Sequence, residues 1–157
     1  MRADSSRAGR LVLIGVALAA LLWGGAKVIS KIRGIRNNNP GNIELGNDVW
    51  VGQVPPEQQT DSRFVQFIAP EYGIRAMARI LSNYMARGLV TVNSIIRTWS
   101  ETDQDAYVEA VSDDLGVDEN APLSMAQLPA LIAAMIDFEN GEQPYSSTTI
   151  AKGVSMA

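Results

Sequence analysis

The chain has 157 residues, enough for one small domain and an appendage, and it contains neither cysteine nor histidine. This absence excludes disulfide bonds, Cys–His and Ser–His–Asp catalytic sites and the usual zinc sites, so any hydrolytic chemistry must use carboxylates, hydroxyls, Lys or Arg. Residues 1–36 hold seven basic residues and one acid, whereas the remainder holds six basic residues and 16 acids; an acidic domain repels phosphate backbones, and nucleic-acid binding by it is not expected.

The N-terminal region reads as a membrane anchor. After a basic tail at residues 1–10, residues 11–26 are uncharged and strongly apolar, and the stretch 11–29 is just long enough for a transmembrane helix of about 20 residues. A cleavable signal peptide is an alternative, because arginines precede the apolar run and the small residues Ala17 and Ala19 resemble a cleavage site. A buried core helix is a second alternative. Basic residues flank both ends, so no orientation is predicted.

A basic linker is predicted at residues 30–36, and a mainly α-helical domain at 37–157. The domain opens on a cluster of turn formers, Asn-Asn-Asn-Pro-Gly-Asn at 37–42. Two short β-like stretches at 49–54 and 63–68 predict a small hairpin or an extended excursion.

Apolar periodicity and turn residues predict the helices that follow. They run from Pro70 to Gly88, from Thr91 through Trp99, from Thr102 to Gly116, from Pro129 to Glu139, and over a last turn at 147–152. Thr102 with Asp105 has the spacing of a capping box, and Asn140-Gly141 ends the fourth helix.

Glu139 is the carboxylate best placed for chemistry. On a helix it shares a face with the apolar residues at 128, 131, 132, 135 and 136, at the C-terminal end. Burial and the negative end of the helix dipole both favour the protonated form, which a general acid for glycoside cleavage requires. The alternatives are that Glu139 bends into solvent at a frayed helix end or caps a neighbouring helix.

Other side chains could assist, each with a plainer alternative. The Asn-rich loop at residues 37–44, called the Asn loop below, could hold a sugar through amide hydrogen bonds, or it could simply be a turn. Asp48 and Asp61 could supply a second carboxylate, or they could be solvated loop acids. No metal and no cofactor are predicted. Aromatic residues that could stack on sugar rings, or serve as packing, are Trp50, Trp99, Tyr72, Tyr107 and Tyr145.

Several strings taken together resemble a family of phage virion proteins, similar to the virion-associated lytic enzyme of cystoviruses. They are GIRNNNPGNI at 34–43, Trp50-x-Gly52, Phe64-x-x-Phe67, PEYGIR at 70–75, and Glu139-Asn-Gly with Pro144-Tyr145. The resemblance spans residues 33–153 and implies a lysozyme-like or lytic-transglycosylase-like domain that opens the host wall. In lysozyme-fold relatives the catalytic Glu ends a helix upstream of the Asn turn.

Here the upstream segment is the apolar one and contains no acid, so the resemblance implies a circularly permuted order. In that order Glu139 is the catalytic residue and Glu44 the reserve candidate. Asn39, Asn42, Trp50 and Tyr145 would bind the glycan. The loop 37–44 should then face the end of the 129–139 helix across a groove.

The predicted function is cleavage of the MurNAc–GlcNAc bond of peptidoglycan by a membrane-anchored virion protein that also contacts other virion proteins. A lytic transglycosylase is preferred to a hydrolytic lysozyme, because it can work with one carboxylate. The alternative is a non-catalytic virion structural protein with a wall-binding lysozyme-like domain.

Overall fold

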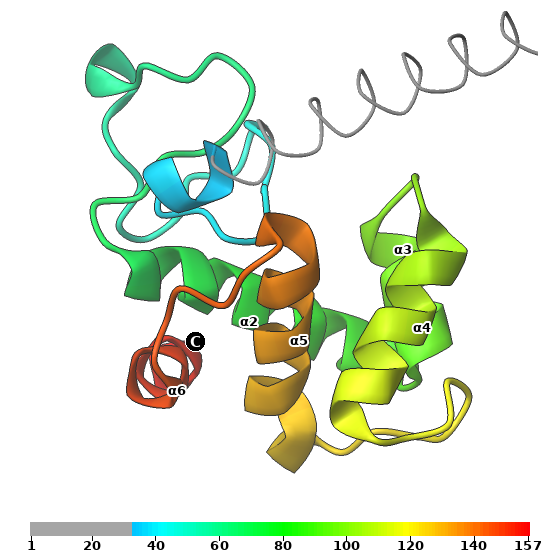
Figure 1. Ribbon diagram of the computed structural model, residues 1–157. Helices are drawn as coiled ribbons and strands as arrows, with labels where there is room; N and C mark the ends of the chain where they lie inside the picture. Colours follow the sequence, from blue (N-terminus) through cyan, green and yellow to red (C-terminus); the bar gives the residue numbers. More distant parts are fainter. Residues whose placement is uncertain (1–32) are drawn as a thin grey trace, which may run out of the picture.

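The computed structural model describes residues 33–157, so the predicted basic tail and the transmembrane helix at 11–29 lie outside the described residues. The described part is mainly helical, as predicted (Figure 1). None of its helices is long and apolar enough to cross a membrane. Its helices are α2 (Pro70–Ala86), α3 (Val92–Trp99), α4 (Gln104–Leu115), α5 (Leu128–Asn140) and α6 (Ser147–Ser155), with short 3-10 helices η1 (Pro56–Gln58) and η2 (Met125–Gln127).

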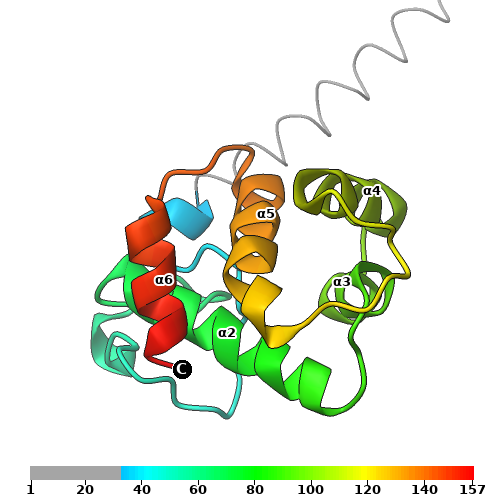
Figure 2. The ribbon, with the colours of Figure 1, turned by 90° about the horizontal axis from the view of Figure 1, so that it is seen from below.

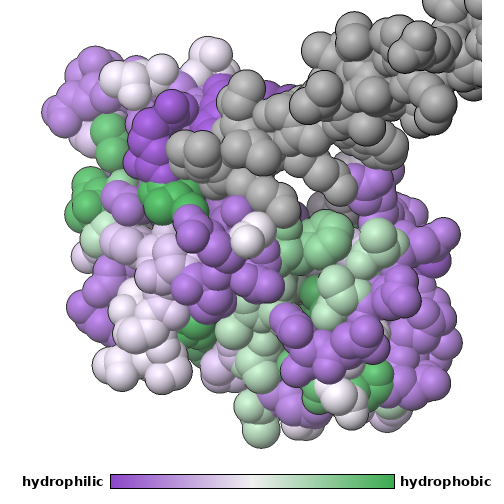
Figure 3. Space-filling model, viewed as in Figure 1, coloured by the Kyte–Doolittle hydropathy of each residue, from purple (hydrophilic) through white to green (hydrophobic). Residues whose placement is uncertain are grey.

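Helix α5 lies at the centre of the domain, where it contacts α2, α4 and α6 (Figures 1 and 2). The pair α3 and α4 lies on one side of α5, and α6 packs against α2 on the other. One apolar core joins these helices. A smaller cluster, Val65, Phe67 and Ala76, lies under the loops that precede α2. The face in Figure 3 is largely hydrophilic, with its apolar surface broken into separate patches.

Most helix ends form where the sequence predicts them. Thr91 caps α3 in a capping box with Ser94, and Gly116 and Gly141 end α4 and α5 in the left-handed conformation, at φ 63° and 72°. The capping box predicted for α4 is wrong. The helix starts at Gln104, after Asp103 at φ 51°, with no side-chain cap. Asp105 instead accepts a charge-assisted hydrogen bond from the Arg97 guanidinium at 2.6 Å.

The predicted β-like stretches form an extended excursion and no hairpin. Within residues 33–157 the only bridges are two isolated antiparallel ones, Glu44 with Phe64 and Gln53 with Phe67. The stretch 63–68 lies between two partners: Val65 N–H donates to the Ile43 carbonyl at 2.9 Å, and Ile68 N–H donates to Gly52 at 2.9 Å. Because its hydrogen bonds are divided between segments 43–45 and 52–54, no continuous two-stranded ladder forms.

Residues 33–36 form a helical turn that is fixed to the domain, so the predicted linker at 30–36 overlaps the folded part. The Arg33 guanidinium donates two hydrogen bonds to Asp61, whose side chain is only 1% exposed. Asp61 also accepts from Asn37 Nδ2 at 2.7 Å and from the backbone N–H groups of Arg63 and Phe64 at 3.0 and 2.9 Å. Chiefly because of Arg33, the pKa of Asp61 lies well below its usual range. Asp61 is therefore a buried structural carboxylate, not a solvated loop acid or a second catalytic one.

We expect Gly73→Ala to destabilise the domain by about 1–3 kcal/mol, because α2 lies against the Asn loop there. A Cβ at position 73 would come 2.1 Å from the backbone oxygen of Asn38 and 2.9 Å from Pro40 Cδ. Gly46→Ala is the matched control, since no atom lies within 4 Å of a Cβ built there. Urea denaturation measures both variants. Equal stability of the two would contradict the close approach of loop and helix.

Candidate functional site

Glu139, near the C-terminal end of α5, is held by donors from three separate elements. Trp99 Nε1 of α3 and the Tyr107 hydroxyl of α4 each donate to Oε1 at 3.1 Å. Asn42 Nδ2, from the Asn loop, donates to Oε2 at 3.0 Å. The side chain of Glu139 is half-buried. The loop 37–44 meets the end of α5 as predicted, but Asn42 bonds Glu139 directly, and Glu139 is not among the residues that line the cavity beside the loop.

Tyr107 is buried in the core beside the Glu139 carboxylate. It is 1% exposed, and its ring stacks on the ring of Phe138, with centroids 3.9 Å apart. Burial, followed by the negative charge of Glu139, raises the pKa of Tyr107 well above its usual value. At neutral pH the phenol is therefore protonated and serves as an O–H donor to Glu139. Its oxygen also lies 3.4 Å from the Met135 carbonyl, a second acceptor.

Side-chain amides of the Asn loop hold its backbone in place. Asn38 and Asn42 have φ values of 52° and 49°, in the left-handed region that Asn tolerates better than most residues. Asn39 is fully buried; its Nδ2 donates to the carbonyls of Ile43 and Val65 at 2.9 and 2.8 Å, and its Oδ1 accepts from Ile43 N–H at 2.9 Å. Asn39 is predicted to bind the glycan, but its side chain is buried and makes three hydrogen bonds that hold the loop together.

Two amide oxygens beside Glu139 are buried without a donor. Asn42 Oδ1 is one, and Oδ1 of Asn140, the residue after Glu139, is the other. Asn140 is fixed, because its Nδ2 donates to the carbonyls of Pro40 and Ile136, both at 2.9 Å. Both oxygens face Gly34, where an added Cβ would lie 2.7 Å from the Asn140 oxygen and 2.9 Å from the Asn42 oxygen. Gly34, the first residue of the GIRNNNPGNI string, therefore leaves space for the two amide oxygens.

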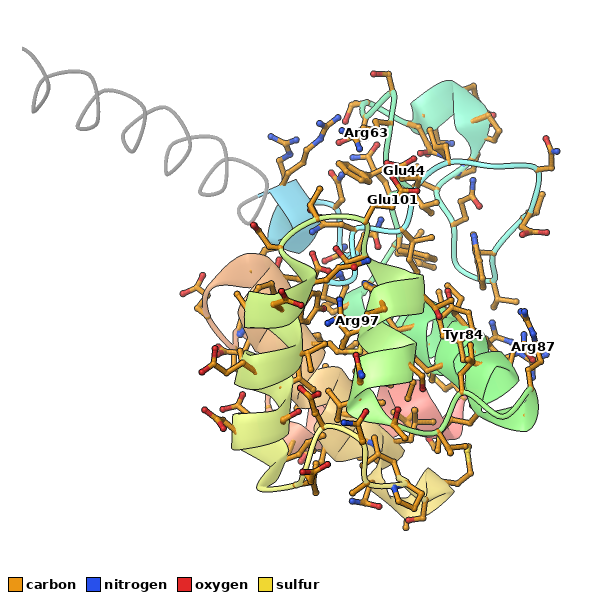
Figure 4. The ribbon with its side chains drawn as sticks, turned by 90° about the vertical axis from the view of Figure 1, so that its right-hand side faces the viewer. Glu44, Arg63, Tyr84, Arg87, Arg97 and Glu101 are labelled. Carbon is orange, nitrogen blue, oxygen red and sulfur yellow. The ribbon has the colours of Figure 1, made fainter. Side chains whose placement is uncertain are left out.

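A cavity of about 200 Å³ borders this cluster at Asn42 and Trp99. It is lined by Gly41, Asn42, Ile43, Glu44, Ile80, Tyr84 and Trp99. Figure 4 shows Glu44 on the loop and Tyr84 on α2. Glu44 is exposed and accepts two hydrogen bonds from the Arg63 guanidinium, at 2.7 and 2.9 Å. Trp99 connects cavity and acid, since it lines the cavity and its Nε1 reaches Glu139.

Two predicted glycan-binding residues lie elsewhere. Trp50 packs against the small cluster of Val65 and Phe67, and lines a separate pocket with two arginines of α2. Tyr145 packs on the main core with its hydroxyl buried, and burial raises its pKa; it does not line the cavity beside Asn42. Of the predicted residues, Asn42 bonds Glu139 and lines the same cavity as Glu44. Among residues 33–157 no group of acidic side chains could hold a metal ion.

The partners of Glu139 were not predicted as such. Trp99 and Tyr107 stand out in sequence only as aromatics for stacking or packing, whereas in the structure their polar atoms serve the carboxylate. The usable signal is that a buried Tyr or Trp generally needs a partner for its O–H or N–H. Apart from Glu139, the predicted helices offer few acceptors on their apolar faces.

Comparison with known proteins identifies a phage relative. The chain is 42% identical over 128 residues to "Protein P5" of Pseudoalteromonas phage PM2, an alignment that covers 77% of this chain and 79% of that protein. No known family profile matches the chain. The prediction of a phage protein is thereby confirmed at the level of the family. The chain belongs to the family of Protein P5 of Pseudoalteromonas phage PM2.

Proposed function

We propose that the chain is a virion-associated protein that cleaves the MurNAc–GlcNAc bond of peptidoglycan, with Glu139 as the general acid. One observation carries the proposal: a half-buried carboxylate meets the Asn loop beside an open cavity, held by Asn42, Trp99 and Tyr107. Asn42 and Trp99 both line this cavity and bond Glu139, so a glycan bound there would lie next to the residues that hold the acid. The resemblance to lysozyme-like phage proteins points to the same residue.

The donors around Glu139 suit an acid that gives up its proton. When the proton passes to the leaving oxygen, negative charge develops on the Glu139 carboxylate. Trp99 Nε1 and the Tyr107 hydroxyl already lie 3.1 Å from Oε1, so they stabilise this charge without rearranging. The carboxylate can then take the proton of the substrate's own C6 hydroxyl as the anhydro sugar closes. That sequence needs one carboxylate only, and we therefore propose a lytic transglycosylase.

Glu44 supports an alternative mechanism in which the same bond is hydrolysed. It lines the same cavity as Asn42 and accepts hydrogen bonds from the Arg63 guanidinium. A second carboxylate beside the general acid is what an inverting or retaining glycosidase uses. The type of reaction product separates the two mechanisms.

We also propose that residues 11–29 anchor the protein in a membrane. The sequence supports this with an uncharged apolar run of suitable length, preceded by a basic tail. The turn at 33–36 is fixed to the domain through Arg33 and Asp61, so few residues separate the apolar segment from the folded part. An anchored domain would act on wall material close to the bilayer, and the membrane and other virion proteins are its proposed partners.

A second candidate function is a virion structural protein that binds the wall without cutting it. The observation that favours it is that all three donors around Glu139 satisfy the carboxylate, as they would in a purely structural site. In this case the cavity beside Asn42 would hold a glycan, and Glu139 would only fix the loop to α5.

Digestion of purified murein by the full-length protein in detergent micelles tests these functions, with products identified by mass spectrometry. We expect anhydro-MurNAc ends. Reducing MurNAc ends would replace the transglycosylase with a hydrolase that uses Glu44. Intact murein that nevertheless co-sediments with the protein would establish the wall-binding function and rule out the enzyme.

A further inference from the structure

We propose that a pocket between the loop at 48–51 and α2 binds the free amino-acid end of a peptidoglycan stem peptide. The ligand that fits it is a diamino-acid side chain that ends in an ammonium and a carboxylate on one carbon, as in stems that contain diaminopimelate. The inference rests on the proposed function, because it takes the wall as the substrate. It adds recognition of the peptide part of the wall to that of the glycan.

The pocket combines charged and apolar walls. Its volume is about 380 Å³, within the range of roughly 300–1,000 Å³ that is usual for small-ligand sites. It is separate from the cavity beside Asn42. The residues that line it are Asp48, Val49, Trp50 and Val51 of the loop, and Arg75, Arg79 and Asn83 of α2.

The two arginines bring positive charge that no protein carboxylate neutralises. Within residues 33–157 neither Arg75 nor Arg79 forms an ion pair with an acid. Arg75 Nε donates to the Met156 carbonyl at 2.9 Å, which fixes this side chain and leaves its terminal nitrogens as further donors. Arg79 is exposed and follows four residues later, on the same face of α2. Guanidinium groups bind carboxylates with charge-assisted, often paired hydrogen bonds, so a carboxylate suits this end of the pocket.

Asp48 makes an ammonium the second group that the pocket suits. Its side chain is exposed, and among the described residues it pairs with no cation. A ligand that is only anionic is attracted by the arginines and repelled by Asp48, whereas a carboxylate with an ammonium beside it is attracted by all three. The charges therefore favour a zwitterionic amino-acid end over an anionic bilayer.

The apolar wall of the pocket belongs to a loop that is already held in shape. Trp50 packs on the small apolar cluster, whereas Val49 and Val51, on either side of it, are 90% and 54% exposed. The Gly52 carbonyl accepts a hydrogen bond from Ile68 N–H at 2.9 Å, which fixes the end of the loop. Exposed aliphatic side chains that gather on a fixed loop mark a contact surface, here for the methylene groups of the diamino acid.

The pocket lies beside the cavity that is proposed to hold the glycan. The cavity uses residues 41–44 with Ile80 and Tyr84, and the pocket uses residues 48–51 with the preceding helix positions, Arg79 and Asn83. Stem peptides branch from the glycan, so a strand in the cavity would present a stem next to α2. In Figure 4, Tyr84 and the end of α2 lie on the side away from the turn at 33–36, where the proposed anchor joins the domain. This position also favours the wall over the bilayer.

A titration followed by nuclear magnetic resonance tests the pocket, with the full-length protein in non-ionic detergent micelles. The probe is the tripeptide L-alanyl-γ-D-glutamyl-meso-diaminopimelate. We expect it to shift the signals of the Trp50 indole N–H and the Arg79 Nε–H. Arg79→Gln should weaken binding by about tenfold, because charge-assisted hydrogen bonds are lost. Arg87→Gln is the matched control, since Arg87 is exposed directly after α2 and does not line the pocket, and its affinity should be unchanged.

Two modified tripeptides assign the groups of the ligand. Amidation of the distal carboxylate of diaminopimelate should weaken binding to the wild type by about tenfold, and Arg79→Gln should then have no further effect. Acetylation of the distal amine should weaken binding to the wild type but not to Asp48→Asn. Losses that add independently in both pairs would contradict the assigned contacts.

Two outcomes would overturn the proposal outright. One is a tripeptide that shifts no signal of the pocket, or that binds Arg79→Gln as well as the wild type. The other is a shift of the same signals by vesicles of phosphatidylethanolamine and phosphatidylglycerol but not by the tripeptide, which would assign the pocket to the bilayer. The tripeptide contains no glycosidic bond, so a protein that binds it and leaves murein intact keeps the pocket and loses the transglycosylase. Cleavage of murein without tripeptide binding removes the pocket alone.

Discussion

Glu139→Gln is expected to abolish lysis of peptidoglycan while leaving the fold intact. Gln keeps the size and shape of the side chain, so Trp99 and Tyr107 retain an acceptor, but the group can no longer donate a proton to the leaving oxygen. General acid catalysis contributes roughly 10²–10⁴ to the rate, and a loss of that size is plain in a turbidity assay on cell-wall suspensions.

The matched control is Asp137→Asn, which removes a carboxylate two residues away on the exposed side of α5. We expect it to retain full activity. Glu44→Gln separates the mechanisms, because a transglycosylase should keep most of its activity and a hydrolase should lose it. Wild-type lysis by a folded Glu139→Gln variant would remove Glu139 from the mechanism.

Asp61→Ala is expected to cost about 3–5 kcal/mol in the free energy of unfolding at neutral pH. The substitution leaves the Arg33 guanidinium without its carboxylate, and it removes the acceptor of two backbone N–H groups and of the Asn37 amide. The turn at 33–36 would lose its main attachment. Chemical denaturation of the full-length chain at pH 7 measures the effect.

The pH dependence of this effect has a defined sign. The pKa of Asp61 is lower in the folded than in the unfolded domain, chiefly because Arg33 holds the ionised form. Its contribution is therefore complete above the unfolded pKa of about 3.9 and declines as the pH falls below that value. The difference between wild type and Asp61→Ala should shrink on acidification. Asp48→Ala, in an exposed loop, is the control and should change little. A difference that grows toward low pH would contradict the buried ion pair.

The local features of the site could be predicted from the sequence. The apolar stripe of α5 predicts that Glu139 points inward at its last turn, and Gly141 predicts where the helix ends. Both are properties of one short segment, so periodicity and turn chemistry suffice. The juxtaposition of Glu139 with the Asn loop came from a family resemblance, because no local pattern joins segments so far apart.

The features that were missed depend on partners distant in sequence. Asn39 and Asn42 belong to one turn-forming string, yet the first is enclosed by Val65 and the second faces Glu139. Asp61 resembles any loop acid until Arg33, 28 residues earlier, is placed beside it. The stretch 63–68 resembles half of a hairpin, because nothing in its sequence shows that it pairs on both sides.

The hydrogen bond between Asn42 and Glu139 joins residues 97 positions apart, and it has a consequence for synthesis of the protein. A chain still growing on the ribosome contains the loop, α3 and α4 long before it contains the carboxylate. Closing so large a loop is among the slow steps of folding, because the entropy of the intervening chain must be lost first. A prematurely terminated chain that ends before α5 would carry every part of the site except its acid. Under the lytic function proposed above, such fragments would lack the general acid and would leave the wall of the producing cell intact.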